Sequence, residues 1–272
     1  MNSVQTHRRG ALATAICLVL VLGACGGDGS ESGTSSGDGG GDSTELVVLG
    51  AASLTESFGA LAEDFEASHD GVEVSLSFGP SDGLATQIIE GAPADVFASA
   101  SGTWMDAVET DGPGAEERTD FVRNRLTLIT PPDNPADVGS IENLGEPGIK
   151  LVLAAKDVPV GGYAREALAN AGVAEEAETN VVSNEEDVKA VVQKVLLGEA
   201  DAGIVYVTDV TPDVVDEVNE IDIPKDINVI ATYPIAVVAG SENAELGSEW
   251  IQLVMSPQGQ ELLRSYHFLP PP

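Results

Sequence analysis

Two serines stand where a helix is expected to begin directly after a predicted strand, and this placement suits the binding of a small anion. Ser53 lies between the apolar segment 45–50 and the helix-periodic segment 54–68, and Ser81 follows a second apolar strand in the same way. A helix N-terminus offers N–H groups without intrahelical acceptors and the positive end of the helix dipole. A hydroxyl beside them would complete a neutral anion site. Ser53 could equally be an ordinary helix cap, with Glu56 in capping-box spacing.

Three further turns carry groups that could face such an anion. Segment 158–163 is a loop rich in proline and glycine before a predicted helix, and Tyr206 ends an apolar strand. Open α/β sheets bind ligands at that end of their strands. Ser183 and Glu186 have capping-box spacing at the start of another helix. The structural alternatives are a tight loop, a tyrosine at a strand rim and a well-capped acidic helix.

The sequence shows no catalytic or metal-binding machinery. Its histidines, His7, His69 and His267, are scattered and lack metal-ligand spacing. No nucleophile elbow, phosphate-binding glycine loop or dinucleotide fingerprint occurs. Asp82 is the only obvious candidate for a base near the turns described above. We therefore expect a binding protein that needs no cofactor, rather than an enzyme.

The elements that must position these turns alternate between strand and helix. Such alternation is typical of parallel sheets covered by helices. We expect strands at 46–50, 72–78, 95–99, 126–130, 149–154, 180–182, 202–206, 227–231 and 234–239, and helices at 54–68, 83–90, 102–109, 162–171, 185–198, 209–218 and 246–264.

The N-terminal region predicts export. Residues 1–24 combine a basic head with an apolar stretch, which is typical of a secretory signal. The residues before Cys25 resemble a bacterial lipobox, which implies that Cys25 is lipidated; a plain cleaved signal is the alternative. The Arg8-Arg9 pair only weakly resembles a twin-arginine signal. Residues 26–44 are glycine, serine and acidic residues almost throughout, and predict a flexible tether.

Charge and cysteine content narrow the function further. The formal net charge is −33, which excludes a nucleic-acid partner. Acidity of this kind could serve solubility alone. The only cysteines are Cys17 and Cys25, so the segment after the signal can form no disulfide within itself.

Taken together, the turns in this order resemble the periplasmic molybdate-binding proteins of ABC transporters. The likeness covers residues 45–272. The segments that carry it are Ala51-Ala52-Ser53-Leu54, Gly91 to Phe97, Trp104-Met105-Asp106, Val158-Pro159 with Gly162-Tyr163-Ala164, Glu186-Asp187-Val188, Gly203 to Tyr206, Tyr233 to Val238 and Ser256 to Gly259.

The resemblance implies a ligand site. In that family, two serine hydroxyls, two backbone N–H groups of the second lobe and one tyrosine hydroxyl hold the oxyanion. These positions correspond to Ser53, Ser81, Val160, Val188 and Tyr206. Spacing alone does not select Val160 or Val188. The sequence departs from the family around Ser81, where Pro80 removes an N–H group and Asp82 adds a carboxylate.

A neutral cavity of this kind implies molybdate or tungstate as ligand. Molybdenum would then enter only as the bound oxyanion, without direct protein–metal ligands. Sulfate is smaller, and phosphate carries a proton at neutral pH that needs an acceptor. A receptor for one of these other tetrahedral oxyanions is the alternative. Ferric iron would require clustered tyrosines or histidines, and an oxyanion sensor would require an output domain.

The family fold implies two α/β lobes with mixed, mainly parallel sheets, joined by two crossover hinge strands. We expect one lobe at 45–125 with 236–272 and the other at 126–235. The protein would be a monomer anchored by lipid at the extracytoplasmic face of the membrane. It would deliver its ligand to the permease subunits of an ABC transporter.

Overall fold

The computed structural model describes residues 43–272. The predicted signal peptide, the lipidation site at Cys25 and nearly all of the predicted tether lie outside these residues. The first strand begins at Thr44, so the last residue assigned to the tether belongs to the fold.

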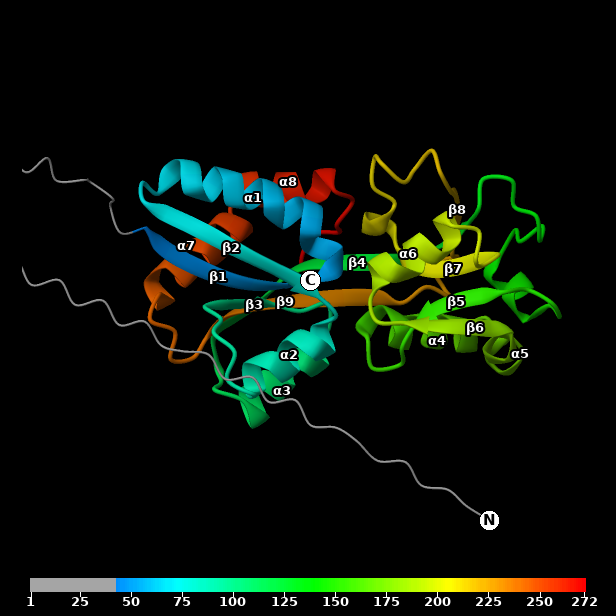
Figure 1. Ribbon diagram of the computed structural model, residues 1–272, viewed down its shortest axis with the longest axis horizontal. Coiled ribbons are helices and arrows are strands. Elements are labelled where there is room, and N and C mark those ends of the chain that lie inside the picture. Colours follow the sequence, from blue (N-terminus) through cyan, green and yellow to red (C-terminus); the bar gives the residue numbers. More distant parts are fainter. Residues whose placement is uncertain (1–42) are drawn as a thin grey trace, which may run out of the picture. The chain divides into compact units, whose positions relative to one another are not determined.

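Nine strands of the described region form a mixed sheet system in the order β2-β1-β3-β9-β4-β7-β5-β6, with β8 paired to β4. Figure 1 shows β4 and β9 running between two groups of strands, β1 to β3 on one side and β5 to β8 on the other. The strands are β1 (Thr44–Ala51), β2 (Val72–Gly79), β3 (Val96–Ala98), β4 (Ala115–Thr130), β5 (Leu151–Ala154), β6 (Val181–Glu185), β7 (Ala202–Tyr206), β8 (Asn219–Asp222) and β9 (Ile230–Val238).

The long strand β4 connects the two groups by changing partner along its length. Its first part, from Ala115 to Arg125, pairs with β9, and from Leu126 onward it pairs with β7 and β8. Within each group the central strand, β1 or β5, has parallel neighbours. Pairings that involve β4 or β9 are antiparallel. The predicted mixed sheet is confirmed. The expectation that it is mainly parallel is wrong, because the crossover strands run against their neighbours and as many pairings are antiparallel as parallel.

Helices cover both faces of each strand group (Figure 1). Helices α1, α7 and α8 lie together over one face of the first group, and α2 and α3 pack on the other. Helices α4 and α6 pack on β5 and β7. The helices are α1 (Thr55–Ser68), α2 (Ser81–Ile89), α3 (Gly102–Asp111), α4 (Pro159–Asn170), α5 (Ala174–Asn180), α6 (Val188–Leu196), α7 (Ala244–Met255) and α8 (Pro257–Ser265), with 3₁₀ turns η1 (Ala52–Leu54), η2 (Ile141–Gly145) and η3 (Val207–Asp209).

The apolar face of α1 shows how the pattern in the sequence becomes packing. Phe58 and Phe65 are fully buried, and both meet the ring of Trp250 edge to face, at centroid distances of 5.5 and 5.6 Å. Such pairs add about 0.5–1.5 kcal/mol each to the gain from burial. This cluster fixes α1 against α7, and therefore fixes the position at which the helix begins, beside Ser53.

Several predicted elements differ from the structure. Strand β4 begins at Ala115 instead of 126, and α5 was not predicted. The predicted helix at 209–218 is wrong, since that segment forms η3 and turns. The predicted helix at 246–264 is two helices, because Pro257 starts α8 and Ser256 caps it. No helix in the described part of the chain has the length and apolar character needed to cross a membrane.

Candidate functional site

The structure brings all five sequence-predicted site residues to one cavity. This cavity has a volume of about 20 Å³ and lies where the two strand groups meet. Each of the five is at most 3% exposed. A cavity this small and this enclosed can hold only a small ligand. Its lining comprises Ala52, Ser53, Gly79, Pro80, Ser81, Ala100, Val158, Pro159, Val160, Asp187, Val188 and Tyr206.

Helix N-termini converge on the cavity from both strand groups. Ser81 is the first residue of α2, and Val188 is the first residue of α6. Pro159 opens α4, so Val160 is its second residue. The first N–H groups of each helix lack intrahelical acceptors, and the helix dipoles place partial positive charge there. The cavity can therefore offer N–H donors to an anion from three helices.

Within the described residues, the hydroxyl of Tyr206 is the one buried polar side-chain group of the cavity wall that has no hydrogen-bond partner. Tyr206 ends β7, is 2% exposed, and its hydroxyl has no hydrogen-bond partner within residues 43–272. Burial raises the pKa of this hydroxyl well above its ordinary value, so it remains a donor at physiological pH. Leaving a buried hydroxyl unpaired costs about 1–3 kcal/mol. An acceptor in the cavity would remove that penalty.

Both serines are already hydrogen-bonded within the protein. The Ser53 hydroxyl lies 2.9 Å from that of Tyr233, and Ser81 Oγ accepts from the N–H of Ala100 at 3.0 Å. The predicted capping box at Ser53 is wrong, because Leu54 occupies the N-cap of α1 and makes no side-chain capping bond. Ser53 is thus turned away from its own helix, toward the cavity and Tyr233.

Among residues 43–272, no lysine or arginine lines the cavity, and Asp187 is the only charged residue that does. That carboxylate caps α6 by accepting from the N–H of Ala190 at 2.8 Å, so the predicted capping box of Ser183 and Glu186 is wrong. Asp82 does not line the cavity, although Pro80 does. Within residues 43–272, no cluster of three or more His, Cys, Asp or Glu side chains is placed to hold a metal ion.

A cluster of charged residues behind the cavity was not predicted. Lys189 Nζ lies 2.9 Å from Glu56 Oε1 and 3.5 Å from Asp209 Oδ1. Asp209 Oδ2 also accepts from the N–H of Tyr206 at 3.2 Å. Burial raises the pKa of Asp209 to about 6, although Lys189 opposes the shift. Burial lowers the pKa of Lys189, but the two carboxylates outweigh burial and raise it overall.

The mouth of the site is a hollow of about 360 Å³ that shares Val158 and Pro159 with the cavity wall. Trp104, from α3, closes one side of it. Its Nε1–H donates to the carbonyl oxygen of Asp157 at 3.0 Å, which joins the first strand group to the loop before α4. A direct hydrogen bond therefore joins the two strand groups beside the cavity.

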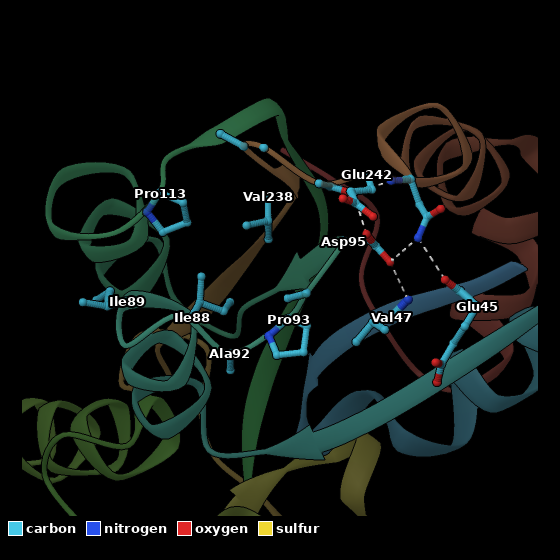
Figure 2. A pocket seen from close by; sticks show the side chains of 16 residues that line it. Glu45, Val47, Ile88, Ile89, Ala92, Pro93, Asp95, Pro113, Val238 and Glu242 are labelled. Carbon is cyan, nitrogen blue, oxygen red and sulfur yellow. Dashed lines mark hydrogen bonds between the residues drawn. The ribbon is translucent and has the colours of Figure 1, made fainter.

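A larger hollow of about 600 Å³ lies at the opposite end of β1 from Ser53 (Figure 2). At its polar end, Asp95 accepts from the N–H of Val47 at 2.8 Å and from the amide of Asn243 at 3.2 Å. Glu45 and Glu242 are exposed around it. The polar groups of Asp95 and Asn243 bind one another, and the exposed carboxylates repel anions, so this hollow does not compete as an anion site.

Sequence reasoning missed Tyr233, Asn124, Lys189 and Asp209, which support the site from behind. Most of their hydrogen bonds reach partners far away in the sequence: Ser53 and Tyr233 are 180 positions apart, and Asn124 and Thr208 are 84 apart. The segment Tyr233 to Val238 was noted only as part of the family likeness. Its buried tyrosine in an apolar run was the one available signal, because a buried hydroxyl needs a partner.

Comparison with known proteins agrees with this geometry. The family described as bacterial extracellular solute-binding protein matches residues 46–269. The molybdate-binding protein ModA of Mycobacterium tuberculosis is 35% identical over 254 residues, which is 93% of this chain and 95% of that protein.

Two solved structures share the fold. The periplasmic molybdate-binding protein of Azotobacter vinelandii has a TM-score of 0.71 at 19% identity, over 84% of this chain and 100% of that one. The sulfate-binding protein SubI of Mycobacterium tuberculosis has a TM-score of 0.69 at 18% identity, and the match covers 84% of this chain and 87% of that one. The two-lobed periplasmic-binding-protein fold expected from the sequence is thus confirmed, and the chain belongs to the family of bacterial extracellular solute-binding proteins, with ModA proteins among its relatives.

Proposed function

We propose that this protein is an extracytoplasmic receptor that binds molybdate or tungstate in the cavity and delivers it to an ABC permease. The observation that carries the proposal is the Tyr206 hydroxyl, buried and unpaired within the described residues at a wall made of helix N-termini. The ModA relatives, which are molybdate-binding proteins, support the same ligand.

The proposed ligands of the oxyanion are the hydroxyls of Ser53, Ser81 and Tyr206 and the backbone N–H groups of Val160 and Val188. A dianion is buried without great cost only when donors meet its oxygens. Helix N-termini and hydroxyls supply these bonds without a counter-charge. A fully deprotonated tetrahedral oxyanion suits such a set, because it needs donors only.

The proposed lobes are 45–125 with 236–272 and 126–235, hinged at the crossover strands. Support comes from β4, which exchanges β9 for β7 and β8 at Leu126. Ser53 and Ser81 would then face Val160, Val188 and Tyr206 across a cleft that closes on the ligand.

Export and anchoring extend the proposal to residues outside the structure. A chain of this family acts outside the cytoplasm, and we propose that Cys25 carries the lipid that holds it at the membrane. The receptor would act as a monomer, without a cofactor and without catalysis. The permease subunits are its proposed protein partners.

A receptor for sulfate is the second candidate, because a cavity of neutral donors also suits that dianion. Sulfate is smaller than molybdate, so the same donors would be stretched around it. Phosphate carries a proton at neutral pH, and Asp187, which caps α6 through Oδ1, is the only carboxylate in the described cavity wall that could accept it.

Thermal unfolding of the purified protein with each oxyanion tests the proposal. Ligand at one hundred times its Kd stabilises a folded protein by about 2.7 kcal/mol. For a protein of this size, that corresponds to a rise in Tm of roughly 5–10 °C. Molybdate and tungstate should produce this rise, whereas sulfate and phosphate at equal concentration should not. An equal rise with sulfate would refute the proposed specificity.

A further inference from the structure

A chain of buried hydrogen bonds runs beneath the cavity from one lobe to the other. Its members are Ser53, Tyr233 on β9, Asn124 on β4 and Thr208 in η3. Tyr233 and Asn124 are fully buried, and both stand on the crossover strands. This series of hydrogen bonds ends at Thr208, two residues after Tyr206. It therefore connects the proposed ligand residue Ser53 with the neighbourhood of Tyr206.

The direction of the hydrogen bonds is set at Asn124. Its Oδ1 accepts from the N–H of Arg125 at 2.9 Å, which fixes the orientation of the amide. Its Nδ2 can only donate. One hydrogen goes to Thr208 Oγ1 at 2.9 Å and the other to the Tyr233 hydroxyl at 3.3 Å. Tyr233 therefore accepts from Asn124.

Tyr233 must then place its own hydrogen on another oxygen. Within the described residues, Tyr233 is hydrogen-bonded to Asn124, which donates, and to the Ser53 hydroxyl at 2.9 Å. The Ser53 hydroxyl is therefore the oxygen that can accept the hydrogen of Tyr233. In the opposite direction the tyrosine O–H would stay unpaired even with an oxyanion in the cavity, whereas a Ser53 hydrogen that points into the cavity is paired by a bound anion. Burial also raises the pKa of Tyr233 far above its ordinary range, so the hydrogen is retained. Ser53 consequently accepts from Tyr233, and its own hydrogen is left for the cavity.

The hydroxyls of Ser81 and Tyr206 can also donate to a ligand in the cavity. Ser81 Oγ accepts from the N–H of Ala100, and the Tyr206 hydroxyl has no partner in the described region. All three cavity hydroxyls therefore have a hydrogen free to donate. An oxyanion that carries a proton needs an acceptor. Ser53 keeps a second lone pair, but it could use it only by turning its own hydrogen away from the cavity, where Tyr233 already donates to it. The remaining acceptor of the wall is the Asp187 carboxylate, whose Oδ1 caps α6.

We propose that Tyr233 and Asn124 are positioning residues that hold Ser53 as a donor, and that this polarity disfavours protonated oxyanions by removing Ser53 as an acceptor. The inference rests on the proposed function and identifies which residues outside the cavity wall give the site its selectivity. Tyr233→Phe would release Ser53 to act as donor or acceptor. Molybdate would then bind more weakly, and hydrogen phosphate would compete better.

Titration calorimetry at neutral pH with molybdate and with phosphate tests this on a double-mutant cycle. The proteins are wild type, Ser53→Ala, Tyr233→Phe and the double variant, with Tyr266→Phe as a tyrosine control that does not line the cavity. Tyr233→Phe should weaken molybdate binding about fivefold, the value of one ordinary hydrogen bond. In the Ser53→Ala background the same change should alter the affinity less than about twofold. The ratio of phosphate to molybdate affinity should rise only while Ser53 is present.

Asn124→Asp provides a second variant if Tyr233→Phe does not fold. A carboxylate at this position would accept from Tyr233, so Ser53 would donate to Tyr233 and become an acceptor toward the cavity. The added negative charge weakens the binding of both dianions, but the ratio of phosphate affinity to molybdate affinity should rise. Two results would overturn this inference while leaving the proposed function intact. One is an equal loss of molybdate affinity from Tyr233→Phe in the wild-type and Ser53→Ala backgrounds. The other is an unchanged ratio of phosphate to molybdate affinity in both Tyr233→Phe and Asn124→Asp. A wild-type protein that binds no molybdate would instead overturn the proposed function.

Discussion

Lys189 and Glu56 form an ion pair across the proposed cleft, with Nζ 2.9 Å from Oε1 and 3.0 Å from Oε2. Glu56 lies three residues after Ser53 in α1, and Lys189 directly follows Val188 in α6. Each side chain is about one-third exposed, at 35% and 30%. The pair requires the two N-termini beside the cavity to lie close together, so opening of the proposed cleft would break it.

Glu56→Gln should therefore weaken ligand binding, mainly by faster dissociation. A partly exposed ion pair contributes about 0.2–1 kcal/mol, which corresponds to a loss of up to about fivefold in affinity. The loss should shrink as salt is raised, because screening weakens the pair in the wild type. Stopped-flow dissociation of molybdate measures it. Glu63→Gln, at an exposed position of the same helix, is the control. An equal loss of molybdate affinity in that variant would contradict a specific role for Glu56.

Tyr206→Phe should separate ligand binding from stability. Without ligand, the variant should be as stable as the wild type or more stable, because the unpaired buried hydroxyl is removed. Molybdate affinity should fall about tenfold or more, since a hydrogen bond to a charged acceptor contributes about 1.5–3 kcal/mol. Thermal unfolding with and without molybdate measures both quantities. Tyr163→Phe, at the mouth of the site, is the matched control; unchanged molybdate affinity in Tyr206→Phe would show that the site is misplaced.

The sequence and the family likeness together placed all five cavity residues, but the likeness was needed for Val160 and Val188. The proposed role of these two lies in their backbone N–H groups, so their side chains carry no chemical signal. Tyr206 could be singled out because it ends an apolar strand. Ser53 and Ser81 could be singled out because each follows a strand and precedes a helix.

Local spacing failed where a side chain has a distant partner. Ser53 and Glu56 have capping-box spacing, yet they bind Tyr233 and Lys189, which are 180 and 133 positions away. The first half of β4 is polar and partly exposed, and its strand conformation depends on pairing with β9. Such long-range contacts cannot be read from a single segment.

Asp209 should make stability depend on pH in a direction opposite to that of a paired surface carboxylate. Burial raises its pKa to about 6, above the unfolded value of about 3.9. The protonated form therefore favours the folded state, and its contribution is complete below about pH 4 and lost as the pH rises through 6. The size is about 3 kcal/mol at 1.36 kcal/mol per pKa unit.

Asp209→Asn isolates this contribution from the other acidic groups. The unfolding free energy of the wild type minus that of the variant should fall by about 3 kcal/mol between pH 4 and pH 7. Urea unfolding at each pH provides the values. Parallel curves for the two proteins would show that Asp209 does not titrate in this range.

Trp104→Phe should weaken binding and remove the optical signal of closure. The indole N–H donates to the carbonyl of Asp157 across the mouth of the site, and phenylalanine keeps the apolar contact but lacks the donor. Affinity should fall about fivefold for one hydrogen bond. The other tryptophan, Trp250, is fully buried in the first lobe. Ligand-dependent fluorescence should therefore vanish in Trp104→Phe; a signal of full size would assign it to Trp250.

Gly161→Ala should disrupt the site through its backbone. A Cβ atom on Gly161 would lie 2.0 Å from the carbonyl oxygen of Ala155 and 2.4 Å from that of Ala154, closer than any real contact. The start of α4 would have to move away from β5, and the N–H of Val160 would move with it. Overpacking of this kind costs about 1–3 kcal/mol, and a displaced donor weakens binding in addition.

Gly162→Ala supplies the matched comparison for this change. Its added Cβ would meet the carbonyl of Lys156 at 3.4 Å, an ordinary contact distance. Alanine is also the better helix former, so the ligand-free protein should be unchanged or up to about 1 kcal/mol more stable. Thermal unfolding and molybdate titration of both variants decide the matter. If Gly161→Ala melts and binds like Gly162→Ala, the close approach of α4 to β5 does not position Val160.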